Sequence, residues 1–98
     1  LEAEYMPHAV CYLLRDGGRI WVVTPFDDQP ATPGNGMMIG LSCATRDEVD
    51  TAHATALAQG GTDEGAPGPR PQYGPEFYGG YIRDLDGNKL SLIHLLAD

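Results

Sequence analysis

One segment of the chain carries the signals of an α-helix, and strand-like runs lie on both sides of it. Thr45-Arg46-Asp47-Glu48 matches a capping box, in which the threonine hydroxyl accepts a hydrogen bond from the glutamate amide while the glutamate side chain reaches back. Gly60-Gly61 provides the stop, because glycine adopts the left-handed conformation at low cost. The pattern predicts one helix over residues 46–59. The side chains at helical spacing that we expect to be buried are Val49, Ala52, His53, Ala56 and Leu57.

The other apolar runs are short and rich in strand-forming residues. They predict strands at residues 9–14, 19–24, 37–44, 77–83 and 89–96. Asp16-Gly17-Gly18 and residues 84–88 are turn signals and predict two hairpins. Residues 60–76 contain five glycines and four prolines, so we expect a long loop there, either a plain surface loop or a pocket wall, with room for one short strand.

The order of these elements predicts an α+β fold. A short strand within residues 60–76 would make the C-terminal part a βαβββ module, and the N-terminal hairpin would be the end of a partial second module without its first strand and helix. We therefore divide the chain into residues 1–30, a partial N-terminal module of hairpin and linker, and residues 31–98, the C-terminal βαβββ module. Because the chain opens at Leu1 and not at a methionine, we expect a fragment or a processed chain.

Composition narrows the function classes. Fourteen acidic and six basic residues give a formal charge of −8, without the basic face that a nucleic-acid binder needs. The same charge disfavours anionic membranes, and no apolar run approaches the roughly 20 residues of a membrane span. We therefore expect no nucleic-acid or membrane partner and, without a visible signal peptide, a cytoplasmic location. Cys11 and Cys43 lie apart in apolar runs, which predicts buried free thiols.

Several short motifs follow one another in a characteristic order. They are Gly34-Asn35-Gly36, residues 49–57 of the helix, Gly65-Ala66-Pro67-Gly68 with Arg70, and, most strongly, residues 77–81 followed by residues 83–90. Together they resemble the glyoxalase/bleomycin resistance/dioxygenase, or vicinal oxygen chelate, superfamily, especially its small bacterial glyoxalase-like proteins. Leu85 departs from the family turn, which has proline there. The resemblance implies two βαβββ modules whose sheets curve around a shared pocket, and a homodimer or an exchange of modules between chains.

The resemblance also implies where a metal would bind. Metal-using members take His, Gln or Glu ligands from the first and last strands of each module, donors that suit divalent cations. Met38 stands where the family has His, Ser91 stands where it often has Glu, and residues 20–24 contain no acid. We therefore expect no metal cofactor, although members with a divalent metal exist. His53 and His94 are interpreted as structural.

The residues that remain favour a small-molecule pocket, because such pockets combine apolar and aromatic walls with a few polar groups. Neither a phosphate-binding glycine motif nor a nucleophile elbow is present, and residues 84–88 are a hairpin turn and not a calcium loop. Arg70 is a candidate anion anchor, and the alternative for the aromatic residues is a core or interface role. The candidate ligand-binding residues are Trp21, Met38, Arg70, Tyr73, Tyr78, Tyr81 and Ser91.

Three hypotheses for the function follow. The first is a metal-free, glyoxalase-like protein that binds a small-molecule ligand, for resistance or sequestration. The second is a metal-dependent lyase, isomerase or dioxygenase of the same superfamily. The third is a structural dimerisation module. The sequence leaves open whether the protein is an enzyme and which ligand it takes.

Overall fold

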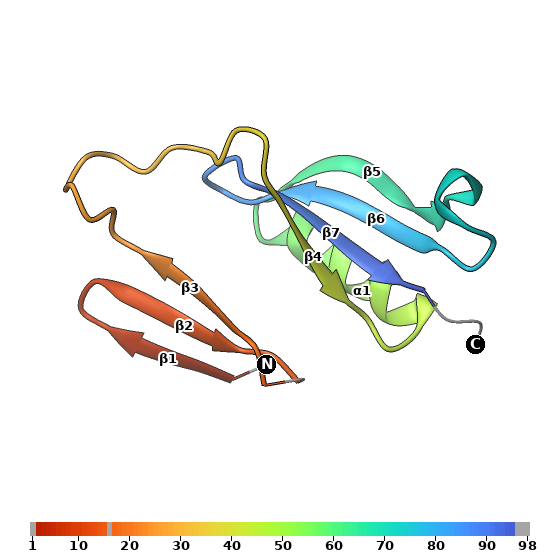
Figure 1. Ribbon diagram of the computed structural model, residues 1–98, viewed down its shortest axis with the longest axis horizontal. Helices are drawn as coiled ribbons and strands as arrows, with labels where there is room; N and C mark the ends of the chain where they lie inside the picture. Colours follow the sequence, from red (N-terminus) through yellow and green to blue (C-terminus); the bar gives the residue numbers. More distant parts are fainter. Residues whose placement is uncertain (1, 16, 96–98) are drawn as a thin grey trace. The chain divides into compact units, whose positions relative to one another are not determined.

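The computed structural model describes residues 2–15 and 17–95, and Figure 1 shows their elements. The chain divides into two compact units, residues 1–31 and residues 32–98, one residue beyond the boundary expected from the sequence. Asp16, in the first predicted turn, and Leu96, at the end of the last predicted strand, lie outside the described residues. The fold is α+β, as predicted.

The N-terminal unit is an antiparallel sheet in the order β1-β2-β3. Its strands are β1 (Glu2–Met6), β2 (Ala9–Leu13) and β3 (Arg19–Val23). The predicted hairpin of β2 and β3 is confirmed, whereas β1 is an additional strand. Alternating glutamates keep β1 from standing out as an apolar run, because only every second residue of such a strand is apolar. Both cysteines are free, as predicted, but only Cys11 is buried and Cys43 is half-buried.

The C-terminal unit is a βαβββ module with the sheet order β4-β7-β6-β5. β4 runs parallel to β7, and the other neighbours are antiparallel. A 3-10 turn, η1 (Pro71–Tyr73), follows β5. The other elements are β4 (Met38–Ser42), α1 (Arg46–Ala58), β5 (Thr62–Pro69), β6 (Tyr78–Arg83) and β7 (Lys89–His94).

Strand β5 is the additional strand for which the sequence left room within residues 60–76, but it occupies much of the segment that was expected to be a loop. It is eight residues long and pairs with β6 through two irregularities of register. Proline cannot donate a hydrogen bond to a neighbouring strand, so it is tolerated at the edge of a sheet or at a bulge. β5 is an edge strand, and for that reason it can contain Pro67 and Pro69 although its composition looks like a loop.

Helix α1 begins and ends where the sequence predicts, within one residue. Thr45 Oγ1 accepts a hydrogen bond from the Glu48 amide at 3.1 Å, and the Glu48 carboxylate accepts one from the Ala44 amide at 3.2 Å. Val49 and His53 are buried, but Leu57 is exposed, so the buried face is narrower than predicted. Among the described residues, no helix has the length and apolar character needed to cross a membrane.

Helix α1 packs on one face of the four-stranded sheet (Figure 1). A Cβ atom added to Gly80 would lie 3.3 Å from His53 Cδ2, so Gly80 faces the helix. Leu92 pairs with Gly80, and His94 lies two residues further along β7 on the same face. His94 is buried and contacts the Cys43 carbonyl oxygen at 3.1 Å, in agreement with the structural role predicted for it.

The opposite face of the sheet, here called the open face, has no α-helix on it within residues 32–95. Tyr81 lies on this face, because successive residues of a strand point to opposite sides. The register pairs Tyr81 with Ser91 and Ser91 with Gly40, which extends the face across β6, β7 and β4. The strand residues of the open face are Met38, Gly40, Ser42, Gly79, Tyr81, Arg83, Lys89, Ser91 and Ile93.

Candidate functional site

Tyr81 is at the centre of the candidate site, and two cations lie against its ring. The Arg70 guanidinium carbon is 5.6 Å from the ring centroid, and Lys89 Nζ is 5.3 Å from it. Both distances are within the range of cation–π contacts. Lys89 was not among the predicted site residues. It precedes Ser91 by two positions on β7, so the alternation of the strand would have placed it on the same face.

The side chain of Arg70 is folded back over β5. Its Nη1 donates to the carbonyl oxygens of Gly68 at 2.9 Å and Pro69 at 3.3 Å, and its Nη2 donates to that of Ala66 at 2.7 Å. Three of the five guanidinium N–H groups are thus used, and Nε–H and one Nη2–H remain. These contacts hold the guanidinium in one orientation beside Tyr81.

Glycines on β5 make room for this arrangement. A Cβ atom added to Gly65 would lie 3.0 Å from Tyr81 Cδ2 and 3.5 Å from Arg70 Nη2. A Cβ atom added to Gly68 would lie 3.3 Å from Arg70 Nη1. A side chain at either position would therefore push on Tyr81 or Arg70. These glycines, which had suggested a loop, instead allow Tyr81 and Arg70 to lie close to the β5 backbone.

Ser91 is completely buried, and its Oγ has no hydrogen-bond partner among the described residues. A Cβ atom added to Gly40 would lie 3.3 Å from this oxygen, so the absence of a side chain on Gly40 leaves space next to the hydroxyl. Buried polar atoms are nearly always hydrogen-bonded, and one without a partner calls for an explanation such as a bound water or ligand.

Aromatic and apolar side chains lie around these polar groups. Met38, on the edge strand β4, is 50% exposed. The rings of Tyr73 and Phe77 contact each other with centroids 5.2 Å apart. Phe77 lies against Gly79, where an added Cβ atom would be 3.0 Å from its Cε1. The Tyr73–Phe77 pair therefore borders the open face, and Phe77 is a second residue that the prediction missed.

Tyr78 and Trp21 do not join this group. The Tyr78 hydroxyl donates to Asp50 Oδ1 of α1 at 2.6 Å, so its side chain lies on the helix face. The hydrogen bond to Asp50, helped by burial, raises the pKa of Tyr78 above its ordinary value of 10.0. Trp21 belongs to the separate N-terminal unit, where it pairs with Cys11 and is 50% exposed.

His53 and Asp63 connect α1 to the start of β5. His53 is buried, and its Nε2 lies 3.1 Å from Asp63 Oδ1. Asp63 also accepts a hydrogen bond from the Gly65 amide at 2.9 Å. The hydrogen bond from the Gly65 amide is the main cause that lowers the pKa of the Asp63 carboxyl below its ordinary value of 3.8, and His53 lowers it further. The pair fixes β5 next to the helix, which fits the structural role predicted for His53.

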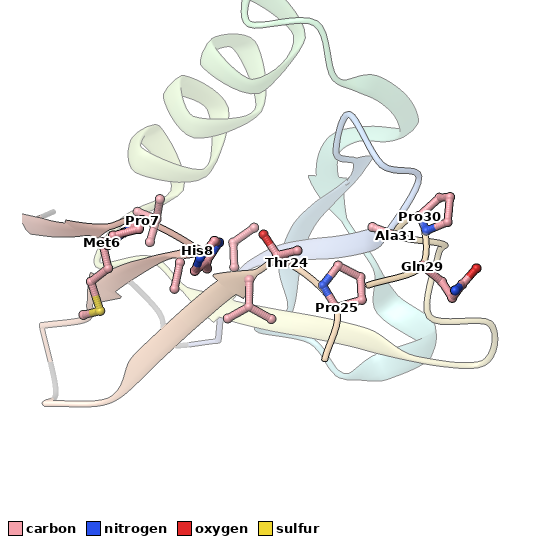
Figure 2. Close-up of a pocket in the computed structure, with 12 residues that line it drawn as sticks. Met6, Pro7, His8, Thr24, Pro25, Gln29, Pro30 and Ala31 are labelled. Carbon is pink, nitrogen blue, oxygen red and sulfur yellow. The ribbon is translucent and has the colours of Figure 1, made fainter. Parts of the chain in front are cut away.

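The N-terminal unit has a separate hollow of about 500 Å³, shown in Figure 2. It lies between the β1–β2 turn, the end of β3 and the segment that follows β3. Most of its lining is apolar, and none of the predicted site residues contributes to it. The lining residues are Met6, Pro7, His8, Ala9, Val10, Val22, Val23, Thr24, Pro25, Gln29, Pro30 and Ala31.

Comparison with solved structures identifies the family. The structure of a glyoxalase/bleomycin resistance protein from Albidiferax ferrireducens T118 is 34% identical to this chain, with a TM-score of 0.83 over 94% of this chain and 73% of that one. The chain belongs to the glyoxalase/bleomycin resistance protein family. It is thereby a member of the vicinal oxygen chelate superfamily, as the sequence motifs suggested.

Two further structures share the fold of this glyoxalase/bleomycin resistance protein family. A hypothetical protein from S. aureus has a TM-score of 0.75 at 22% identity, over 95% of this chain and 74% of that one. A glyoxalase-related enzyme from Fulvimarina pelagi has a TM-score of 0.72 at 20% identity, over 93% and 67%. No family model and no curated protein matches the sequence.

Residues of the open face do not fit a glyoxalase-type metal site. At the two positions where the sequence resemblance led us to look for ligands, Met38 offers a thioether and Ser91 a buried neutral hydroxyl, whereas divalent cations of this kind prefer imidazole and carboxylate donors. Among residues 2–15 and 17–95, no group of three or more His, Cys, Asp or Glu side chains could hold a metal ion. The donors around Tyr81 are instead cations and hydroxyls.

Proposed function

We propose that this protein binds a small molecule on the open face of its C-terminal module, without a metal ion, and that it acts in resistance or sequestration. The observation that carries the proposal is the grouping of Tyr81, two cations and the unpartnered Ser91 hydroxyl on one sheet face. The family resemblance places a metal ligand at the position of Ser91 in metal-using members, and we propose that Ser91 contacts the small molecule directly instead.

The composition of the face supports binding of an organic molecule. Ligand sites combine apolar and aromatic walls with a few polar groups that fix orientation. Met38 contributes a flexible, polarisable side chain, and the Tyr73–Phe77 pair contributes aromatic surface. The polar groups are the ones that surround Tyr81. The relative from Albidiferax ferrireducens is described as a glyoxalase/bleomycin resistance protein, a name that covers the binding role proposed here as well as the enzymatic alternative.

A calorimetric titration with small aromatic compounds that are anionic, neutral or cationic, in buffer containing a metal chelator, tests the proposal. We expect at least one class to bind, and Tyr81→Ala to weaken that binding by about tenfold or more, as loss of a central aromatic contact does. Tyr78→Phe is the matched control, because it changes a tyrosine on the helix face. Circular dichroism of each variant confirms folding.

Two results would remove the proposal. One is that no compound of any charge class binds. The other is that binding disappears with chelator and returns with added divalent metal, which would establish the metal-dependent alternative.

We also propose a homodimer, because the N-terminal sheet exposes large apolar side chains. Trp21, Val22 and Val23 of β3 are each about half exposed, and Tyr5 of β1 is 78% exposed. Tyr5 and Val22 lie on one face of this sheet and Trp21 and Val23 on the other, so both faces expose apolar side chains, as interaction surfaces often do. Light scattering on purified protein should give twice the mass of the chain, and Trp21→Ser should shift the mass towards the monomer. A monomeric wild-type protein would contradict the dimer.

A further inference from the structure

The basic residues of the C-terminal unit are gathered on one side of its sheet. The chain as a whole is acidic, with a formal charge of −8. Residues 32–95 contain four basic residues, and Arg70, Arg83 and Lys89 lie at the open face. The fourth, Arg46, lies over the ring of Tyr78 on the helix side. A cationic face on an acidic chain indicates a local requirement for positive charge.

Among the described residues, two of these three cations have no acidic partner. Arg83 forms an ion pair with Glu64. Within the part of the chain that the structure describes, neither Arg70 nor Lys89 has a carboxylate at ion-pair distance, and both lie against Tyr81 instead. A cation–π contact stabilises a cation without neutralising it. Both cations therefore keep their positive charge next to the Tyr81 ring.

We infer that the ligand of the open face carries an oxyanion group, a carboxylate or a phosphate, that binds beside Tyr81, where Arg70 and Lys89 supply positive charge. The inference rests on the proposed function, since it names the ligand class of the same site. Arg70 can donate from Nε and from one Nη2 hydrogen, because backbone carbonyls occupy the other three donors. A guanidinium fixed in this way presents two donors to one oxyanion at small entropic cost.

Ser91 adds a neutral donor next to this pair of cations. It pairs with Tyr81 across the β6–β7 ladder, and its buried hydroxyl has no hydrogen-bond partner within residues 2–15 and 17–95. An oxyanion accepts hydrogen bonds only, so cations and a hydroxyl donor are the groups that it requires. The ligand's organic part would then lie along Met38 or the Tyr73–Phe77 pair, which border the same face.

The acidic charge of the whole chain does not oppose such binding. At physiological ionic strength the Debye length is about 8 Å, so distant surface carboxylates are largely screened. An anion in contact with the open face interacts mainly with Arg70 and Lys89. Its affinity should therefore depend on these two residues and not on the net charge of the protein.

The test compares benzoate, phenyl phosphate, inorganic phosphate, neutral benzamide and cationic benzylamine by calorimetry, with chelator present. Lys89→Gln should weaken binding of the anionic aromatic compounds by about tenfold or more, as expected for loss of one charge-assisted hydrogen bond, while Lys89→Arg keeps it. Arg46→Gln is the matched control, because it removes the same charge from the helix side. The ratio of benzoate to phenyl phosphate affinity distinguishes a carboxylate from a phosphate ligand.

The possible results distinguish the oxyanion inference from the proposed function on which it rests. Preference for an anionic compound, lost in Lys89→Gln and kept in Arg46→Gln, supports the inference. Binding of benzamide or benzylamine as tight as that of the anions, or equal losses in Lys89→Gln and Arg46→Gln, overturns the oxyanion inference and leaves small-molecule binding intact. Absence of binding by every compound overturns the proposed function and the inference together.

Discussion

Replacing Ser91 with alanine should stabilise the protein. The Ser91 hydroxyl is fully buried and has no hydrogen-bond partner among the described residues, so folding removes it from water without compensation. Such a group costs about 1–3 kcal/mol. Alanine keeps the Cβ atom and removes only the oxygen, which leaves a very small void. We expect Ser91→Ala to raise the free energy of unfolding by about 1 kcal/mol, or Tm by about 4–8 °C for a domain of this size.

Urea denaturation followed by far-ultraviolet circular dichroism measures this change, with Ser42→Ala as the control. Ser42 lies on the exposed part of β4, so its substitution should stay within about 0.5 kcal/mol of the wild type. The same Ser91→Ala protein should bind the ligand of the open face more weakly, which is the signature of a functional polar group kept at the expense of stability. Destabilisation of Ser91→Ala by 1 kcal/mol or more (about the value of one net hydrogen bond) would show that the hydroxyl has a structural partner and refute the reasoning.

Three further predictions concern the helix side of the module. Tyr78 has a raised pKa because its hydroxyl donates a hydrogen bond to Asp50. Its contribution to stability is therefore complete below pH 10 and is lost as pH rises through the folded-state pKa. Asp50→Asn should lower the midpoint of tyrosinate formation in an ultraviolet absorbance titration, and an unchanged midpoint would contradict the assignment. Asp63 has a lowered pKa, so its contribution is present above its unfolded pKa near 3.8 and is lost as pH falls through the folded-state value. Asp63→Asn should therefore flatten the acid limb of the stability profile, and an unaltered profile would exclude this role. Thr45→Ala removes the helix cap and should cost about 1 kcal/mol in urea unfolding, whereas a change near zero would mean that the cap contributes nothing.

The parts of the fold that short-range signals determine could be predicted from the sequence. The threonine cap and the glycine stop locate α1, because both act through hydrogen bonds and backbone conformations within one turn. The turn at residues 84–88 similarly sets the β6–β7 hairpin. β5 could not be predicted in the same way, because its glycines and prolines are acceptable only at the edge of a sheet, and edge position is a property of the whole topology.

The candidate site, like the fold, could be predicted from the sequence only in part. Alternation along β7 correctly separated Ser91 from His94 and could also have added Lys89. Tyr78 and Tyr81 are three residues apart on β6, an odd spacing that puts them on opposite faces, so the sequence contained the means to separate them. The position of Arg70 against Tyr81 was beyond prediction, because it depends on the course of β5 and on the space left by Gly65.

The central claim, binding of a small molecule on the open face without a metal, is tested most directly by a ¹⁵N chemical-shift titration with an anionic aromatic compound in the presence of a metal chelator. The account predicts saturable shifts that centre on the amides of Tyr81, Lys89 and Ser91, with no change at the helix residues Asp50 and His53. Shifts that are absent, that lie on the helix side, or that appear only after a divalent metal is added would contradict it.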